Sequence, residues 1–228
     1  MQRLLWWIMT CLAIAVAGYA LVQYFVLDAS QAGFVQMKEL FLARLGAVWF
    51  AMLFIHAASS LIALVIGPFT LSAKFRENNI RLHRIFGKIY VIGVGIGSLS
   101  GFYLALYATG GWVGKAGFMT LSILWFTTAY QAFINIKEKR VLAHRKWMIR
   151  NYSLTLAAVT LRIWLPLFAW LFGLENFELS YAAIAWFSWV PNIFVAEWFI
   201  SRKLIKQARL KTTSQIADAL ESRTTELP

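Results

Sequence analysis

Long apolar stretches alternate with short polar segments along this chain. Each stretch is nearly free of charge, and a helix of about 20 such residues crosses the roughly 30 Å of hydrocarbon in a bilayer. Hydrophobic residues make up 60% of the sequence and charged residues only 14%, which argues against a soluble domain. The pattern predicts an all-α, polytopic membrane helix bundle with six spans, at about residues 4–27, 46–71, 89–109, 117–136, 151–172 and 181–201.

We expect one transmembrane domain over residues 1–201, because no linker separates its apolar stretches into independent units. Residues 202–228 form a polar tail on the cytoplasmic side. Its sparse apolar positions predict a short amphipathic helix on the membrane surface, followed by disordered residues. These positions are Leu204, Ile205, Ile216 and Leu220.

The first apolar stretch also resembles a secretory signal, with Arg3 in front of it and small residues around Ala17. Its apolar run is longer than a typical signal core, and its charged region is a single arginine. We therefore interpret it as an uncleaved anchor. Cleavage would leave five spans in the same orientation.

Basic residues concentrate on one side of the predicted membrane. One precedes the first span, five lie in the loop 74–88, six in the loop 137–150 and six in the tail, against three on the opposite side. The positive-inside rule then places both termini in the cytoplasm, and we expect a bacterial cytoplasmic (inner) membrane. The net charge of +12 points to anionic phospholipid at the cytoplasmic loops and to no nucleic acid.

Two His-Arg pairs, His83-Arg84 and His144-Arg145, stand at matching positions on this basic side, each just ahead of an outward-running span. Neutral imidazole is a good axial ligand for haem iron. The two arginines could pair with the propionates. The pattern thus predicts one haem b held by His83 and His144. In the alternatives, the imidazoles contact phospholipid phosphate, handle protons or bind a substrate.

Two basic residues lie within the spans themselves. His56 falls in the outer half of the second span, too far from His83 for the two to bind the same iron. It either packs through a hydrogen bond, or it accepts a proton or contacts a quinone. Arg162 lies roughly 18 Å beyond Arg150 by helical rise. Because a charged guanidinium at that depth is costly, it should face the bundle or a polar cavity. It either binds an anionic ligand or bonds backbone carbonyls near Pro166.

Asn192 and Glu197 in the last span complete the set of candidates for ligand or proton handling. Asn192 is close to Arg162 in depth and follows Pro191, which breaks the span and frees backbone acceptors. Glu197 is the only acid within the six predicted spans. With a single cysteine, Cys11, and no pair of carboxylates in a span, we expect no metal site beyond haem iron.

Two features predict how helices pack. Gly93, Gly97 and Gly101 recur at four-residue spacing in the third span, which lets a neighbouring helix, or a flat ligand, approach closely. Gly67-Pro68 should break the second span near its inner end.

The segments His83-Arg84-x-x-Gly87-Lys88-x-Tyr90 and His144-Arg145-x-Trp147-Met148-x-Arg150-x-Tyr152 resemble the signature of an uncharacterised bacterial family of predicted multi-pass membrane proteins. The likeness extends over roughly residues 45–200. That family is a domain of unknown function, so it implies which residues matter without implying a reaction. The chain is also distantly similar to cytochrome b561-type bundles, which hold haem between histidines of neighbouring helices. The similarity to such bundles implies two pairs of haem ligands, whereas the three histidines of this chain allow at most one bis-histidine haem.

Three functions follow from these residues. The first is electron transfer through one haem b, linked to quinone. The second is a transporter or binding protein for a small anionic or lipidic ligand, with Arg162 and His56 lining its cavity. The third is a membrane assembly or scaffold subunit with basic loops that contact partners. No motif of a hydrolase or transferase is present, so whether the chain is an enzyme stays open.

Overall fold

The computed structural model describes residues 2–27, 30, 35–36 and 46–202. Within this part of the chain the fold is all-α, with no strand, as the sequence predicts. The prediction for the tail falls outside the described residues, apart from Arg202. The elements are α1 (Gln2–Leu21), the π-helical turn η1 (Val22–Val26), α3 (Ala47–Leu71), α4 (Ala73–Asn78), α5 (Ile80–Leu106), α6 (Gly111–Lys137), α7 (Val141–Thr155), α8 (Ala157–Phe172), η3 (Leu174–Asn176) and α9 (Phe177–Phe187), and residues 190–202 are helical too.

Five helical segments are long and apolar enough to cross a membrane: Trp6–Val26, Ala47–Leu71, Ile80–Leu106, Val141–Phe172 and Leu174–Arg202. The remaining predicted span lies in α6. This helix is as long as α5, at 27 residues. It is less apolar because polar side chains such as Ser122, Thr128 and Asn135 lie on its buried face. Because these polar side chains lie on the buried face, they can be accommodated in a helix that spans the membrane.

The basic segments are helical, where the sequence analysis expected loops. Helix α5 begins at Ile80 and α7 at Val141, between two and three turns before the predicted spans start, so both His-Arg pairs lie on helices. Asn79 caps α5 by accepting a hydrogen bond of 3.0 Å from the amide of Leu82. Arg, Lys and Leu are good helix formers, so a polar segment can extend a span into the interface.

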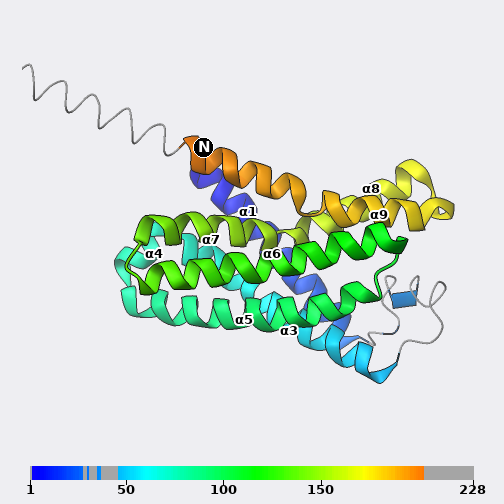
Figure 1. Cartoon of the computed structure of the whole chain (residues 1–228), viewed down its shortest axis with the longest axis horizontal. Coiled ribbons are helices and arrows are strands. Elements are labelled where there is room, and N and C mark those ends of the chain that lie inside the picture. Colours follow the sequence, from blue (N-terminus) through cyan, green and yellow to red (C-terminus); the bar gives the residue numbers. More distant parts are fainter. Residues whose placement is uncertain (1, 28–29, 31–34, 37–45, 203–228) are drawn as a thin grey trace, which may run out of the picture.

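Helices α3, α5, α6 and α7 form a closed ring in which each packs on the next and α7 returns to α3 (Figure 1). Beyond the ring, α1 packs on α3 and α8, and α9 packs on α6 and α8. The chain bends between α7 and α8 at Leu156, whose ψ of −8° departs from the α-helical value. As a result α7 completes the ring, while α8 packs on α1 and α9 farther out.

A proline inside α3 creates a hydrogen-bonded contact between α3 and α7 near the basic end. Pro68 has no N–H, so the carbonyl of Leu64 loses its helical donor. The hydroxyl of Tyr152 on α7 donates to that carbonyl at 3.0 Å. Gly67 makes room for this contact, because a Cβ there would overlap the Tyr152 ring. The predicted break at Gly67-Pro68 is therefore a junction between α3 and α7, within a helix that continues to Leu71.

The glycine stripe of α5 faces α3 and α6. A Cβ at Gly93 would lie 3.1 Å from the carbonyl oxygen of Ser59, and one at Gly97 would lie 2.9 Å from the Trp125 ring. The stripe therefore serves close helix packing, the first of the two interpretations.

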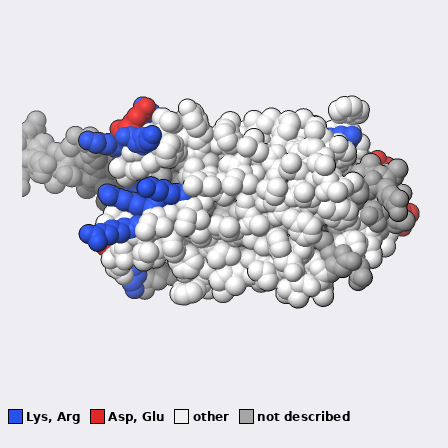
Figure 2. Space-filling view, turned by 90° about the horizontal axis from the view of Figure 1, so that it is seen from below, with Lys and Arg blue, Asp and Glu red and all other residues white. Residues whose placement is uncertain are grey.

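Charge is distributed as the sequence predicts. In Figure 2, Lys and Arg gather at one end of the molecule, with a single basic side chain visible near the other. The charged end holds the start of α5 and the ends of α6 and residues 190–202, including Arg81, Lys137 and Arg202. This asymmetry supports an orientation with that end in the cytoplasm.

Candidate functional site

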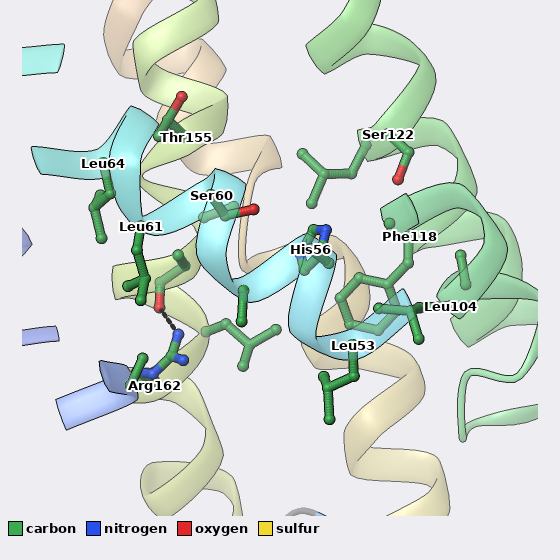
Figure 3. A pocket seen from close by; sticks show the side chains of 18 of the residues that line it. Leu53, His56, Ser60, Leu61, Leu64, Leu104, Phe118, Ser122, Thr155 and Arg162 are labelled. Atoms are coloured by element: carbon green, nitrogen blue, oxygen red, sulfur yellow. Dashed lines mark hydrogen bonds between the residues drawn. The ribbon is translucent and has the colours of Figure 1, made fainter. Parts of the chain in front are cut away.

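A cavity of about 300 Å³ lies in the half of the bundle away from the basic end (Figure 3). Helices α1, α3, α5, α6, α8 and α9 surround it, and the last turn of α7 closes it on one side. The cavity lies beside the junction of α7 and α8, with Thr155, Ala157 and Ala158 in its wall. The wall is mostly Leu and Ala, with a few polar groups. Small-molecule sites commonly combine these features.

His56 and Arg162 both line this cavity. His56 lies nine residues from the start of α3, and Arg162 ten residues before the end of α8, each about 15 Å along its helix from the outer end. Arg162 thus borders a cavity that also contains polar side chains, and Figure 3 shows Arg162 and His56 on different helices of its wall.

The His56 ring is fixed in place. Its Nδ1 lies 2.7 Å from the carbonyl oxygen of Gly97. Since a carbonyl only accepts, Nδ1 carries the hydrogen and donates it, which leaves Nε2 of the neutral ring as an acceptor. Gly101, one turn farther along α5, leaves room for the ring, because a Cβ there would lie 2.9 Å from both Nδ1 and Cε1. The edge of the Trp125 ring completes the contact, with centroids 6.4 Å apart.

Arg162 lacks an acidic partner among the described residues. Its Nη1 donates to the carbonyl of Ala158, one turn back on the same helix, at 2.7 Å. Its guanidinium also lies over the Tyr19 ring of α1, 5.8 Å from the centroid. A guanidinium has five N–H donors. Backbone bonding, one of the two interpretations from sequence, therefore accounts for one of these donors.

Two serines add hydroxyls to the wall. The Oγ of Ser60 is buried and has no hydrogen-bond partner in the described part of the chain. Ser122 also lines the cavity, where its Oγ lies next to Gly101 and the His56 ring. Both hydroxyls therefore add polar surface to a wall that is otherwise mostly apolar.

A satisfied polar network forms the inner floor of the cavity. Thr155, which lines it, accepts a hydrogen bond of 2.9 Å from Nε1 of Trp125. The Tyr90 hydroxyl lies 3.0 Å from the same oxygen and donates to Oδ1 of Asn151 at 2.6 Å. Asn151 in turn donates to Thr128 at 2.8 Å. Because these side chains come from α5, α6 and α7, the network holds the ring together at mid-depth.

The two His-Arg pairs lie at the basic end, away from the cavity. Tyr90 and Asn151 are hydrogen-bonded across the ring, and His83 and His144 each precede one of them by seven residues, about 10 Å along the helix. The two histidines therefore lie at a similar depth on α5 and α7. Arg84 and Arg145 beside them are exposed.

The environments of these two imidazoles differ. Nδ1 of His144 lies 2.8 Å from the carbonyl oxygen of Ala132 and donates to it, so Nε2 is left free. Nδ1 of His83 is buried without a hydrogen-bond partner among the described residues. One ring is thus oriented as a metal-binding histidine usually is, and the other is not. Haem ligation by this pair stays a prediction.

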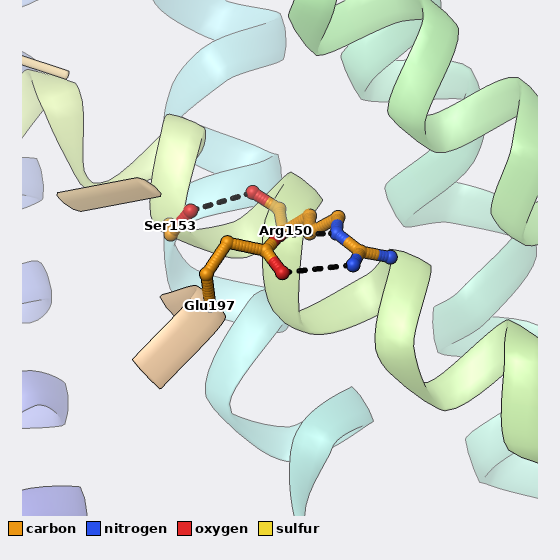
Figure 4. Close-up of polar contacts among 3 residues, drawn as sticks. All are labelled: Arg150, Ser153 and Glu197. Atoms are coloured by element: carbon orange, nitrogen blue, oxygen red, sulfur yellow. Dashed lines mark hydrogen bonds and ion pairs between the residues drawn. The ribbon is translucent and has the colours of Figure 1, made fainter. Parts of the chain in front are cut away.

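Asn192 and Glu197 are not among the residues that line the cavity. Asn192 donates to the carbonyls of Ser153 and Ser188 at 3.2 and 3.1 Å, across the break before Pro191. Glu197 forms a bidentate pair with Arg150, with distances of 2.5 Å to Nε and 2.9 Å to Nη2 (Figure 4). Both side chains therefore join the last helix to α7, a structural use that the sequence analysis did not foresee.

Together the helices and the cavity define a polytopic α-helical membrane protein with a partly polar chamber inside the bilayer. Residues 52–200 match the family described as "Predicted membrane protein (DUF2306)", which is well over half of the 228 residues, so the chain belongs to this family. No curated protein and no solved structure gave a match. The predicted family type is thereby confirmed, and the likeness to cytochrome b561-type bundles stays a prediction.

Proposed function

We propose that this protein binds a small anionic molecule with an apolar body in the chamber beside Arg162, as a transporter or binding protein of the bacterial cytoplasmic membrane. The observation that carries the proposal is a guanidinium at mid-membrane depth that borders a cavity and has no carboxylate partner in the described part of the chain. An arginine within a span is costly unless it is paired or hydrated. An anionic ligand would remove that cost through charge-assisted hydrogen bonds.

The wall supports an amphipathic ligand rather than a hydrated ion. Apolar side chains make up most of the chamber wall, among them Leu53, Leu61, Leu104 and Leu165. Burial of apolar surface contributes about 25 cal/mol per Å², so a hydrocarbon body would add affinity there. A volume of about 300 Å³ is at the lower end of the range for ligand pockets, which favours a small molecule.

His56 offers a second polar contact. Its Nε2 is an acceptor in the neutral ring, and the hydroxyls of Ser60 and Ser122 are nearby in the same wall. The His56 nitrogen and the two hydroxyls could bind a hydroxyl or carbonyl group of the ligand, at a distance from the anionic group that Arg162 binds. The chamber therefore also suits a quinone head group, although a neutral quinone would leave Arg162 without a counter-charge.

Decanoate and decanol test the proposal, because they share a chain length and differ in charge. We expect decanoate to raise the thermal unfolding midpoint of the wild-type protein in nanodiscs, since a ligand that binds the folded state stabilises it. Decanol should raise it less. Arg162→Gln should remove the difference between the two compounds, Arg162→Lys should keep part of it, and Arg202→Gln, at an exposed arginine, should keep all of it. An equal response of the wild type and Arg162→Gln would contradict the proposal.

The chamber does not include His83 or His144. The binding function is thus independent of the haem and electron-transfer prediction, and each can fail without the other.

A further inference from the structure

Tyr19 on α1 marks the place where the chamber meets the lipid-facing surface. It lines the chamber, yet the residue is 57% exposed. Each of the other described residues of the wall is buried or only partly exposed. Tyr19 lies seven residues before Val26, the outer end of its span, which is about 10 Å along the helix. The chamber therefore reaches the surface in the outer half of the bilayer, beside Arg162.

Packed side chains close the outer and inner ends of the chamber. At the outer end, Trp49 and Leu53 of the wall form a buried hydrophobic cluster with Val35. At the inner end, the hydrogen bond between Trp125 and Thr155 belongs to the polar network of the ring. A ligand from the water on either side would have to displace one of these sets of contacts.

The two seams beside α8 are also packed over much of their length. Between α8 and α9, the Phe187 ring contacts the rings of Trp164 and Phe168, with centroids 5.5 and 6.0 Å apart. Between α1 and α8, Ala17 and Val159 belong to one buried hydrophobic cluster. These two residues lie on the inner side of Tyr19 and Arg162, so this cluster closes the inner half of the α1–α8 seam.

The outer half of the α1–α8 seam is held differently. There the Arg162 guanidinium lies over the Tyr19 ring, 5.8 Å from its centroid. No buried hydrophobic cluster of the described residues joins α1 to α8 at this depth. A cation–π contact at an exposed site is weak compared with a packed core, so the ring can move away at little cost. Its movement would uncover the guanidinium from the lipid side.

We propose that the ligand enters the chamber from the outer leaflet, between α1 and α8, and that Tyr19 is the gate of this entrance. The inference rests on the proposed function and narrows its ligand class to single-chain amphiphilic anions that partition into the bilayer, such as fatty carboxylates. The carboxylate binds Arg162 as the Tyr19 ring moves aside. A chain longer than the chamber continues between the two helices into the lipid.

The association rates of decanoate and hexadecanoate test the route. Both are carboxylates, but hexadecanoate partitions more strongly into lipid because it buries more CH₂ groups. The wild-type protein in nanodiscs is mixed with each compound, and tryptophan fluorescence follows binding, since Trp49 and Trp125 line the chamber. Entry from the bilayer predicts equal association rates at equal mole fraction in the lipid. Rates that agree instead at equal free concentration in water would overturn the proposal.

Tyr19→Ala tests the gate. It should raise the association and dissociation rates of decanoate together, by about two- to fivefold, the factor that corresponds to a cation–π contact at an exposed site. The affinity should change little, because the Arg162 side chain is kept. Tyr19→Phe retains the aromatic ring and should raise both rates less. Leu21→Ala is the control, at a position of α1 that is 52% exposed and does not line the chamber.

The outcomes separate the entrance from the binding site. Saturable decanoate binding that depends on Arg162, with equal rates in Tyr19→Ala and Leu21→Ala, would overturn the gate and leave the proposed function in place. A wild-type protein without saturable binding would remove both proposals.

Discussion

The hydroxyl of Tyr152 donates a hydrogen bond of 3.0 Å to the carbonyl of Leu64, the acceptor that Pro68 leaves without its helical donor. The contact joins α7 to α3 and closes the four-helix ring. It also satisfies the carbonyl that Pro68 leaves without a donor, and an unsatisfied carbonyl inside a membrane protein would cost several kcal/mol. Gly67 permits it by leaving space for the ring.

Tyr152→Phe should therefore lower the free energy of unfolding by about 1 kcal/mol, since the Leu64 carbonyl loses its donor while the ring stays in place. Gly67→Ala should lower it by about 2 kcal/mol, because the new methyl group overlaps the ring. Gly87→Ala is the matched control, as a Cβ at that position meets no atom within 4 Å. Unfolding of the purified variants in mixed micelles measures all three. An equal stability of Gly67→Ala and Gly87→Ala would contradict the proposed junction.

Gly101→Ala should impair the chamber while leaving the bundle folded. A Cβ there would lie 2.9 Å from the His56 ring, so the ring must move away from the Gly97 carbonyl or into the chamber. We expect weaker decanoate binding, by about tenfold if the shift costs about 1.4 kcal/mol. Gly95→Ala, on the same helix with nothing within 4 Å of its Cβ, should bind as the wild type does. Unchanged binding in both variants would show that the position of His56 does not matter to the ligand.

Arg150 and Glu197 should behave as a pair. Their bidentate contact joins α7 to the last helix, while the Glu197 side chain is still 42% exposed. Glu197→Gln should thus lower the free energy of unfolding by only about 1 kcal/mol. A double-mutant cycle with Arg150→Gln measures the coupling energy. Strictly additive effects would mean that the contact contributes nothing to stability.

The orientation is open to a direct test. The basic end carries the start of α5 and the ends of α6 and residues 190–202, so we expect both termini in the cytoplasm. Green fluorescent protein fused to the C-terminus should then fluoresce, and alkaline phosphatase fused there should be inactive. The opposite pair of results would invert the topology and place the chamber nearer the cytoplasm.

Much of the architecture is visible in the sequence, because lipid imposes simple rules on length and charge. Apolar stretches located the helices, the basic residues marked one end, and spacing along α5 and α7 placed His83 and His144 at the same depth. The depth of Arg162 predicted that it would face a polar cavity. Helix ends were predicted less well, since Arg and Lys at the interface extend a helix as readily as Leu does.

The chamber itself could not be predicted in this way. It lies beside the junction of α7 and α8 at Leu156, where neither a proline nor a glycine marks a break in an otherwise apolar run. Ser60 and Ser122 are common in packed spans, so their exposure to a cavity leaves no signal in the sequence. The depth of Asn192 near Arg162 and the place of Glu197 as the one acid in the predicted spans make both of them candidates for ligand handling, whereas the structure gives both of them partners on α7.

Equilibrium binding of radiolabelled decanoate to nanodiscs with the wild type and Arg162→Gln tests the central claim most directly. The account predicts saturable binding near one molecule per chain, displaced by unlabelled decanoate but poorly by decanol, and weakened at least tenfold in Arg162→Gln, because the variant loses a charge-assisted pair worth about 1.5–3 kcal/mol. Binding that is non-saturable in both proteins, or equally tight in both, would contradict the assignment of Arg162 as the anion-binding residue of the chamber.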